Sequence, residues 1–238
     1  MMAKDNFKEN ALKEGISLFN RGNFSAALTF FLSLPDDEGI DSVELSYYLG
    51  LCYSKLKRYD DALAYLEQVV TSAHGRSPAE IDEGRIFQCR YILAVIYCLT
   101  GREKLADFEL KKLLETGYNR DKVYSSLAYI SWERGESDQA VEYYEKSLLE
   151  NETNPTALNG LGYVLAVEGK ELTKALSCCK KALDMEPENA ACLDSLGYVY
   201  LRMGLYSEAR KFLERAYSKR PDSSIIEGHL RELQAGEE

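Results

Sequence analysis

Apolar residues along this chain recur at helical spacing, and the helices they predict come in pairs. Residues 190–203 place Leu196 and Tyr200 on one face of a first helix, because positions four residues apart lie on the same side. Gly204 ends that helix, since glycine readily adopts the left-handed conformation found at helix ends. A second helical stripe follows and stops before Pro221, which disfavours helical geometry in the residue before it. The pattern predicts two antiparallel helices joined by a short turn.

The same pair of helices is repeated six times. Counted from seven residues before a small residue on each first helix, the copies start at 8, 43, 87, 121, 155 and 190, with spacings of 35, 44, 34, 34 and 35 residues. A unit this short cannot bury its own apolar face, so neighbouring copies are expected to stack. Each copy has one small residue on each helix, which we expect to let the helices approach closely. These twelve residues are Gly15, Gly50, Ala94, Ala128, Gly162 and Gly197 on the first helices, and Ala27, Ala62, Ala106, Ala140, Ala175 and Ala209 on the second.

The repeated pattern resembles that of the tetratricopeptide repeat family, in which an aromatic or apolar residue is followed by Leu-Gly, Tyr, Ala, Phe and Pro. The matching residues are Tyr124, Leu127, Ala128, Ala140 and Tyr144 in the fourth copy, and Leu193, Leu196, Gly197, Tyr200, Ala209, Leu213, Ala216 and Pro221 in the sixth. The resemblance covers roughly residues 8–223. It implies an all-α fold, a right-handed α-solenoid of six stacked helix-turn-helix repeats with a C-terminal capping helix, forming a single domain over residues 1–238.

A helical insert is predicted at residues 77–86, where the spacing exceeds the period by about ten residues. Ser77 is a suitable capping residue, Pro78 suits the first helical position, and Glu80 follows the serine by three residues. We therefore expect the first helix of the third copy to extend over 78–99. Residues 91–99 are apolar on every side, although a surface helix normally has one polar face. Neighbouring repeats are expected to cover most of this helix, and either a bound partner or a second copy of the chain, as in a homodimer, is expected to cover the rest.

A capping helix is predicted over residues 224–234. Ser224 and Glu227 resemble a capping box, in which the two side chains satisfy free amide groups at a helix start. Ile226, Leu230 and Leu233 then lie on one face, which would cover the last repeat.

Charge and hydropathy narrow the class of partner and the location. The chain has 29 Lys and Arg against 39 Asp and Glu, so its net charge of −10 disfavours binding to nucleic acid. The longest apolar run, residues 92–99, is far shorter than a membrane span. No signal peptide is visible at the N-terminus, and unpaired cysteines suit a reducing compartment. We therefore expect a cytoplasmic protein, or a periplasmic one if a signal peptide has been removed.

No motif for catalysis, a cofactor or a metal ion is found. The chain has no glycine-rich phosphate loop, no Gly-x-Ser-x-Gly and no His-Glu-x-x-His, and its two histidines are far from its cysteines in sequence. The adjacent Cys178 and Cys179 allow a thiol or metal site, but small residues packed inside a helix are the simpler interpretation. The sequence thus predicts a protein that is not an enzyme.

The family resemblance implies a concave groove lined by the first helix of each repeat. Tyrosine and tryptophan on this face are typical of a recognition surface, because their rings bury much area and keep a polar tip. The alternative is that these rings only pack between repeats. The lysine and asparagine set with which some family members bind acidic peptide tails is absent from these positions. We predict a non-catalytic scaffold or adaptor that binds a partner protein or peptide. The alternative is a self-assembling, homo-oligomeric structural protein that uses the extended helix 78–99. The predicted groove residues are Leu12, Ile16, Phe19, Tyr47, Leu51, Tyr91, Tyr129, Trp132, Asn159, Tyr163, Asp194 and Tyr198.

Overall fold

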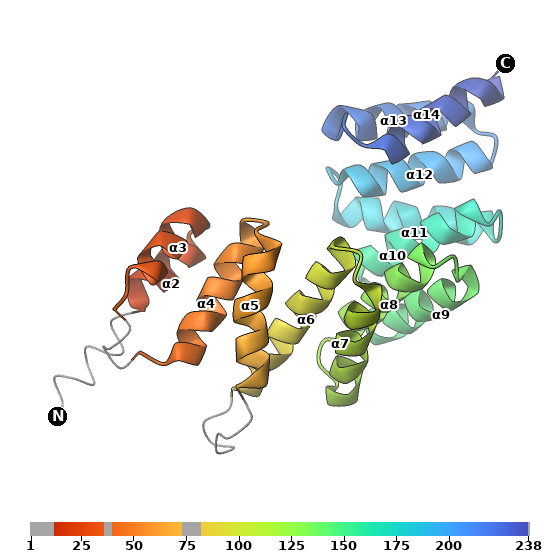
Figure 1. Cartoon of the computed structure of the whole chain (residues 1–238). Helices are drawn as coiled ribbons and strands as arrows, with labels where there is room; N and C mark the ends of the chain where they lie inside the picture. Colours follow the sequence, from red (N-terminus) through yellow and green to blue (C-terminus); the bar gives the residue numbers. More distant parts are fainter. Residues whose placement is uncertain (1–11, 36–39, 73–81, 238) are drawn as a thin grey trace. The chain divides into compact units, whose positions relative to one another are not determined.

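The structure, a computed structural model, describes residues 12–35, 40–72 and 82–237, and all regular elements in these residues are α-helices (Figure 1). The all-α class predicted from the sequence is confirmed. The chain divides into two compact units, unit 1 (Met1–Tyr118) and unit 2 (Asn119–Glu238), and each is described by itself. The single domain over residues 1–238 stays a prediction.

Unit 1 contains six described helices and unit 2 contains seven. The helices of unit 1 are α2 (Lys13–Asn20), α3 (Phe24–Leu32), α4 (Ser42–Lys55), α5 (Tyr59–Thr71), α6 (Glu83–Leu99) and α7 (Glu103–Thr116). Those of unit 2 are α8 (Arg120–Glu133), α9 (Ser137–Glu150), α10 (Pro155–Val167), α11 (Leu172–Met185), α12 (Ala190–Arg202), α13 (Tyr206–Lys219) and α14 (Ser224–Glu237). Within each unit, consecutive helices pack in pairs and each pair packs on the next, as the repeat predicts.

The small residues predicted to sit at helix contacts do so. The alanines of all six second helices are completely buried. At Gly162 on α10, an added Cβ would lie 2.4 Å from Sγ of Cys179 and 2.9 Å from the carbonyl oxygen of Ala175, both on α11. A larger residue would force the two helices apart, so the spacing of the pair depends on this glycine.

The turn between paired helices requires a left-handed residue. Gly135 has φ +75° between α8 and α9, and Lys57 has φ +60° between α4 and α5, where the other repeats have glycine. A lysine in this conformation is strained, because its Cβ approaches the neighbouring backbone. The same turn geometry is therefore imposed on a residue that does not favour it.

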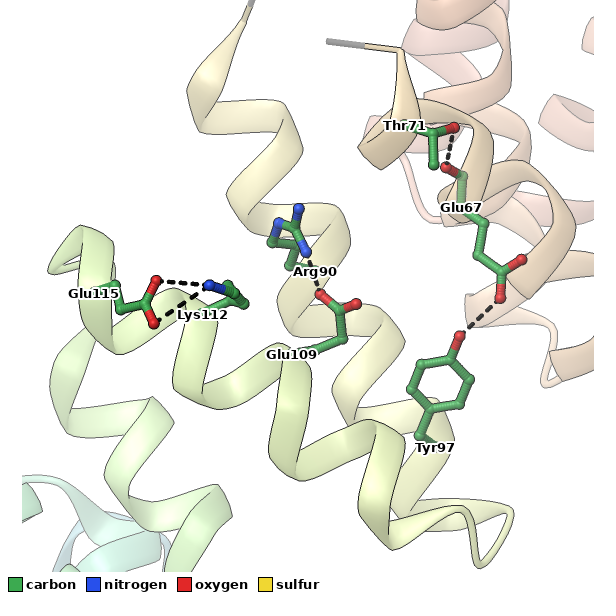
Figure 2. A network of polar contacts seen from close by, with 7 residues as sticks. All are labelled: Glu67, Thr71, Arg90, Tyr97, Glu109, Lys112 and Glu115. Carbon is green, nitrogen blue, oxygen red and sulfur yellow. Dashed lines mark hydrogen bonds and ion pairs between the residues drawn. The ribbon is translucent and has the colours of Figure 1, made fainter. Parts of the chain in front are cut away.

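Polar contacts join neighbouring helices in unit 1 (Figure 2). The hydroxyl group of Tyr97 on α6 donates a hydrogen bond to Oε1 of Glu67 on α5, at 2.7 Å. Two turns earlier on α6, Arg90 Nη1 lies 2.6 Å from Glu109 Oε2 on α7. Burial and the Glu67 carboxylate both raise the pKa of Tyr97, so its hydroxyl keeps the proton that it donates. These contacts fix α5, α6 and α7 in register with one another.

The start of α6 differs from the prediction of a helix over 78–99. α6 begins at Glu83, and the non-helical Asp82 precedes it with φ −87° and ψ 88°. Oδ1 of Asp82 accepts a hydrogen bond from the backbone N–H of Arg85, so the capping residue is Asp82 and not Ser77. Residues 77–81 of the predicted insert lie outside the described residues. Within residues 91–99, Leu99 alone is exposed, since α4, α5 and α7 pack against the rest.

The capping helix is present as α14, but its cap also differs by one residue. Oγ of Ser223 accepts a hydrogen bond from the backbone N–H of Ile226 at 3.5 Å, so Ser223 is the capping residue and Ser224 is the first helical one. Glu227 forms an ion pair with Arg231 one turn further on, and does not complete a capping box. The expected apolar face is confirmed, because Ile226 and Leu233 are buried in the core of unit 2.

Candidate ligand-binding cavity

A row of aromatic rings runs along the first helices of unit 2. Tyr129 and Trp132 lie on α8, Tyr163 on α10 and Tyr198 on α12. The ring centroids of Trp132 and Tyr163 are 5.9 Å apart, and those of Tyr163 and Tyr198 are 5.8 Å apart. These distances are typical of aromatic pairs in contact. Three of the predicted groove residues, Trp132, Tyr163 and Tyr198, therefore form a row of rings in unit 2.

A cavity of about 430 Å³ opens beside these rings, and we call it the unit 2 cavity. Its volume is in the range of small-ligand sites. Five predicted groove residues contribute to it: Tyr129, Trp132, Asn159, Tyr163 and Asp194. The other lining residues are Glu133, Tyr144, Pro155, Thr156, Gly160, Val164, Glu186, Asn189, Ala191, Cys192, Ser195 and Ile225. The sequence analysis did not place these twelve in the site, because they come from five different helices and the turn before α12.

The Tyr144 side chain reaches the cavity because the residue of α10 that faces its ring is a glycine, Gly160. A Cβ added at Gly160 would lie 2.2 Å from the Tyr144 ring, so any side chain there would displace the tyrosine. The Tyr144 side chain on α9 is buried, which raises the pKa of its hydroxyl group. The sequence contains both Gly160 and Tyr144, but their contact could not be predicted from it, because it arises only when α9 and α10 pack together.

The cavity lining is acidic. It contains the carboxylates of Glu133, Glu186 and Asp194, and no Lys, Arg or His belongs to the described residues that line it. Burial, together with the nearby Asp194, Glu232 and Glu133 carboxylates and the Tyr198 hydroxyl group, raises the pKa of Tyr163 to about 12. The electrostatic environment of the rings therefore favours positive charge.

Asn159 is an incompletely satisfied polar group in this lining. Its Oδ1 is buried and accepts no hydrogen bond from the residues that the structure describes. A buried acceptor without a donor costs free energy, and a bound ligand that supplies a donor would recover it. This makes Asn159 a position where a ligand N–H group would be stabilised.

The C-terminal end of the predicted groove is closed by His229 of α14. The His229 ring stacks on Tyr198 with centroids 4.2 Å apart, and its Nδ1–H donates a hydrogen bond of 2.9 Å to Oδ1 of Asp194. All three side chains are buried. Asp194 and Tyr198, which the sequence analysis assigned to partner binding, are thus held by the capping helix. His229 falls three residues after Ile226, on the buried stripe of α14, and this spacing was the available sequence signal.

Family models describing the tetratricopeptide repeat match residues 44–73, 121–154 and 153–222 of the chain. Together these segments cover more than half of its length. The chain belongs to the tetratricopeptide repeat family. Its six helical pairs are consistent with the six repeats predicted from the spacing. Members of this family commonly mediate protein–protein interactions.

Comparison with individual tetratricopeptide repeat proteins agrees with this fold. The solved structure of Pseudomonas aeruginosa pilF is similar with a TM-score of 0.72 and 17% identity, over 97% of this chain and 99% of that one. The structure of YrrB, titled as a TPR protein with an unusual peptide-binding site, has a TM-score of 0.52 and 20% identity, over 80% of this chain and 92% of that one. Protein O-mannosyl-transferase TMTC1 of Homo sapiens is 24% identical over 188 residues, which are 78% of this chain and 20% of that protein. The chain thus spans a fifth of the length of this curated relative.

The predicted groove residues of unit 1 are mostly buried or half-buried. Leu12, Tyr47 and Leu51 are buried, and the Tyr47 hydroxyl group donates a hydrogen bond to Gln88 Oε1 at 2.8 Å. Ile16, Phe19 and Tyr91 are half-buried. Tyr47 and Leu51 lie on α4 and pack against its neighbours, and partner binding by these residues stays a prediction.

The adjacent cysteines of this tetratricopeptide repeat chain are part of the packing. Cys178 and Cys179 are both buried, and burial raises the pKa of each thiol. A protonated, buried thiol is a poor nucleophile. No cluster of His, Cys, Asp and Glu that could hold a metal ion occurs in the described part of the chain, and no helix there is long and apolar enough to cross a bilayer. The cytoplasmic location and the homodimer stay predictions.

Proposed function

We propose that this protein is a non-catalytic adaptor that binds a segment of a partner protein in the unit 2 cavity. The observation that carries the proposal is the cavity itself, with its aromatic walls. Tyr129 is 47% exposed, and Trp132 and Tyr163 are half-buried beside it. Large, rigid side chains at a hollow surface are characteristic of binding hot spots.

The chemistry of the cavity supports binding and not catalysis. The Cys192 thiol is buried, and burial raises its pKa to about 11, so it is not an activated nucleophile. Asp194 already accepts a hydrogen bond from His229, and this pair is enclosed by Tyr198. The similarity to a mannosyl-transferase covers one fifth of that protein, and its activity is not extended to this chain.

The proposal is tested by selecting peptides from a displayed random library on the immobilised full chain, and then measuring their affinities. Tyr129→Ala and Trp132→Ala are each expected to weaken binding by about 2 kcal/mol, or about thirtyfold. Tyr217→Ala is the matched control, since Tyr217 is also an exposed tyrosine of unit 2 but lies on α13 and does not line the cavity. Its affinities should equal those of the wild type.

The thermal unfolding midpoint of each variant separates binding from folding. Tyr129 is exposed, so its removal should leave the midpoint nearly unchanged. If the library yields no peptide, or if the selected peptides bind the Tyr129 and Trp132 variants as tightly as the wild type, the unit 2 cavity is not the binding surface.

A further inference from the structure

The α8 and α10 sides of the unit 2 cavity carry different side chains. Tyr129, Trp132 and Glu133 stand on α8, where the last turn of the helix carries two rings and a carboxylate within five residues. Asn159 and Tyr163 face it from α10, one helical turn apart. A ligand group that enters here meets aromatic faces and a carboxylate, and the Asn159 amide lies beside them with its oxygen buried.

Glu133 differs from three carboxylates on the second helix of its pair, which form ion pairs. On α9, Glu142 pairs with Lys146, Glu145 pairs with Lys174 of α11, and Glu150 pairs with Arg120. Glu133 is exposed at the rim of the cavity, and it has no ion-pair partner among the residues that the structure describes. Its charge is therefore available to a ligand.

No cation of unit 2 neutralises this rim among the described lining residues. Arg202 of α12 does not line the cavity, and its Nη1 donates to the carbonyl oxygen of Val167 and to the Tyr198 hydroxyl group. Glu186, on the far side, accepts a hydrogen bond from Asn189, which leaves its negative charge in place. The negative groups around Tyr163 that raise its pKa are consistent with the same field.

We infer that the unit 2 cavity receives an arginine side chain from an extended segment of the partner, with its guanidinium group against the rings of Tyr129 and Trp132 and its N–H groups directed to Glu133 and Asn159. This inference rests on the proposed function and specifies its ligand. A guanidinium group is planar, stacks on aromatic faces and carries five N–H donors. Rotation of the Asn159 amide about χ2 presents its oxygen to one donor. The net charge of −10 attracts a basic segment over a longer range.

The chain supplies its own reporter for the test, because Trp132 is its single tryptophan and lines the cavity. The probes are four pools of acetylated pentapeptide amides, with arginine, citrulline, leucine or glutamate fixed at the centre and the other positions randomised. Citrulline has the shape of arginine without its charge. Binding is measured by the change in Trp132 emission and by calorimetry on the full chain.

The arginine pool is expected to bind at least about tenfold more tightly than the citrulline pool. This preference should shrink when the salt concentration is raised to about 0.5 M, since the rim is exposed. In Glu133→Gln the preference should fall to about threefold or less, and in Glu133→Lys the glutamate pool should bind better than the arginine pool. Glu208→Gln on α13 is the control, because it removes an exposed carboxylate that does not line the cavity.

The outcomes distinguish this inference from the proposed function. If the citrulline, leucine or glutamate pool binds as tightly as the arginine pool, or if Glu133→Gln keeps the full arginine preference, the inference is overturned while peptide binding stands. If no pool changes Trp132 emission or releases heat, the proposed function fails together with the inference.

Discussion

Nδ1 of His229 and Oδ1 of Asp194 lie 2.9 Å apart, and both side chains are buried between α12 and α14. This contact ties the capping helix to the first helix of the last repeat. The His229 ring also lies 6.0 Å from Tyr163, which lines the unit 2 cavity. The capping helix therefore supports one wall of the cavity in addition to covering the core.

Replacing His229 by alanine should destabilise the protein. The change leaves the Asp194 carboxylate buried without its donor and removes the ring that stacks on Tyr198, which we expect to cost about 2–4 kcal/mol in the free energy of unfolding. Urea denaturation measures this loss. Hydrogen exchange should accelerate in α14 more than in α12. The reason is that α14 packs against α12 and α13, whereas α12 also packs against α10 and α11.

A double-mutant cycle identifies the contact as the cause. His229→Ala, Asp194→Asn and the double variant should show a coupling free energy, since the second change costs less once the partner is gone. Additive effects would mean that the two residues act independently, and the role assigned to their hydrogen bond would be wrong.

Gly162→Ala should weaken the packing of α10 against α11. The new methyl group would lie 2.9 Å from the carbonyl oxygen of Ala175, and this backbone atom cannot move without shifting a helix. We expect a loss of about 1–3 kcal/mol in the free energy of unfolding, measured by urea denaturation.

Gly228→Ala on α14 is the matched control, because a Cβ there meets no atom within 4 Å. Alanine should raise stability at that helical position by up to about 1 kcal/mol. Equal effects at the two positions would contradict the close helix approach at Gly162.

Stability should fall as the pH rises above 9. Burial raises the pKa of Cys52 and Cys192 to about 11 and of Cys89 to about 12, from an ordinary value of 9.0. Between these values the unfolded chain releases thiol protons that the folded chain retains, so the free energy of unfolding decreases with increasing pH. Below pH 9 this contribution to stability is fully present. Urea midpoints at pH 7.5, 9 and 10.5 measure the effect.

A comparison with Cys89→Ala isolates the thiol contribution from that of the tyrosines. The variant lacks one shifted thiol, so its stability should fall less steeply over the same pH range. The native thiols should also react slowly with a maleimide at pH 8 and rapidly in urea. A slope unchanged by Cys89→Ala, or rapid labelling of the folded protein, would show that these cysteines are accessible.

Local patterns were enough to predict the repeats and their turns. The apolar stripes repeat every three or four residues, and this periodicity is sufficient to place a helix. The turn at Lys57 falls where the other repeats have glycine, and its φ of +60° shows that the turn has the same geometry without glycine. Helix starts were less certain, since Asp82 and Ser223 cap helices where Ser77 and Ser224 were expected. Several nearby side chains are able to cap, and local sequence does not rank them.

The amino-acid sequence by itself determined the helical pairs, the small residues at their contacts and the row of rings on α8, α10 and α12, because all of these follow from spacing along one helix or one repeat. Only the tertiary structure decided which of these rings stay accessible. Tyr198 and one side of Asp194 are covered because α14 packs on α12 and places His229 against them. The unit 2 cavity also depends on Tyr144 and Ile225, which are far from Trp132 in sequence. Burial depends on what every neighbouring element brings to a position, and that information is not contained in the periodicity of a single helix.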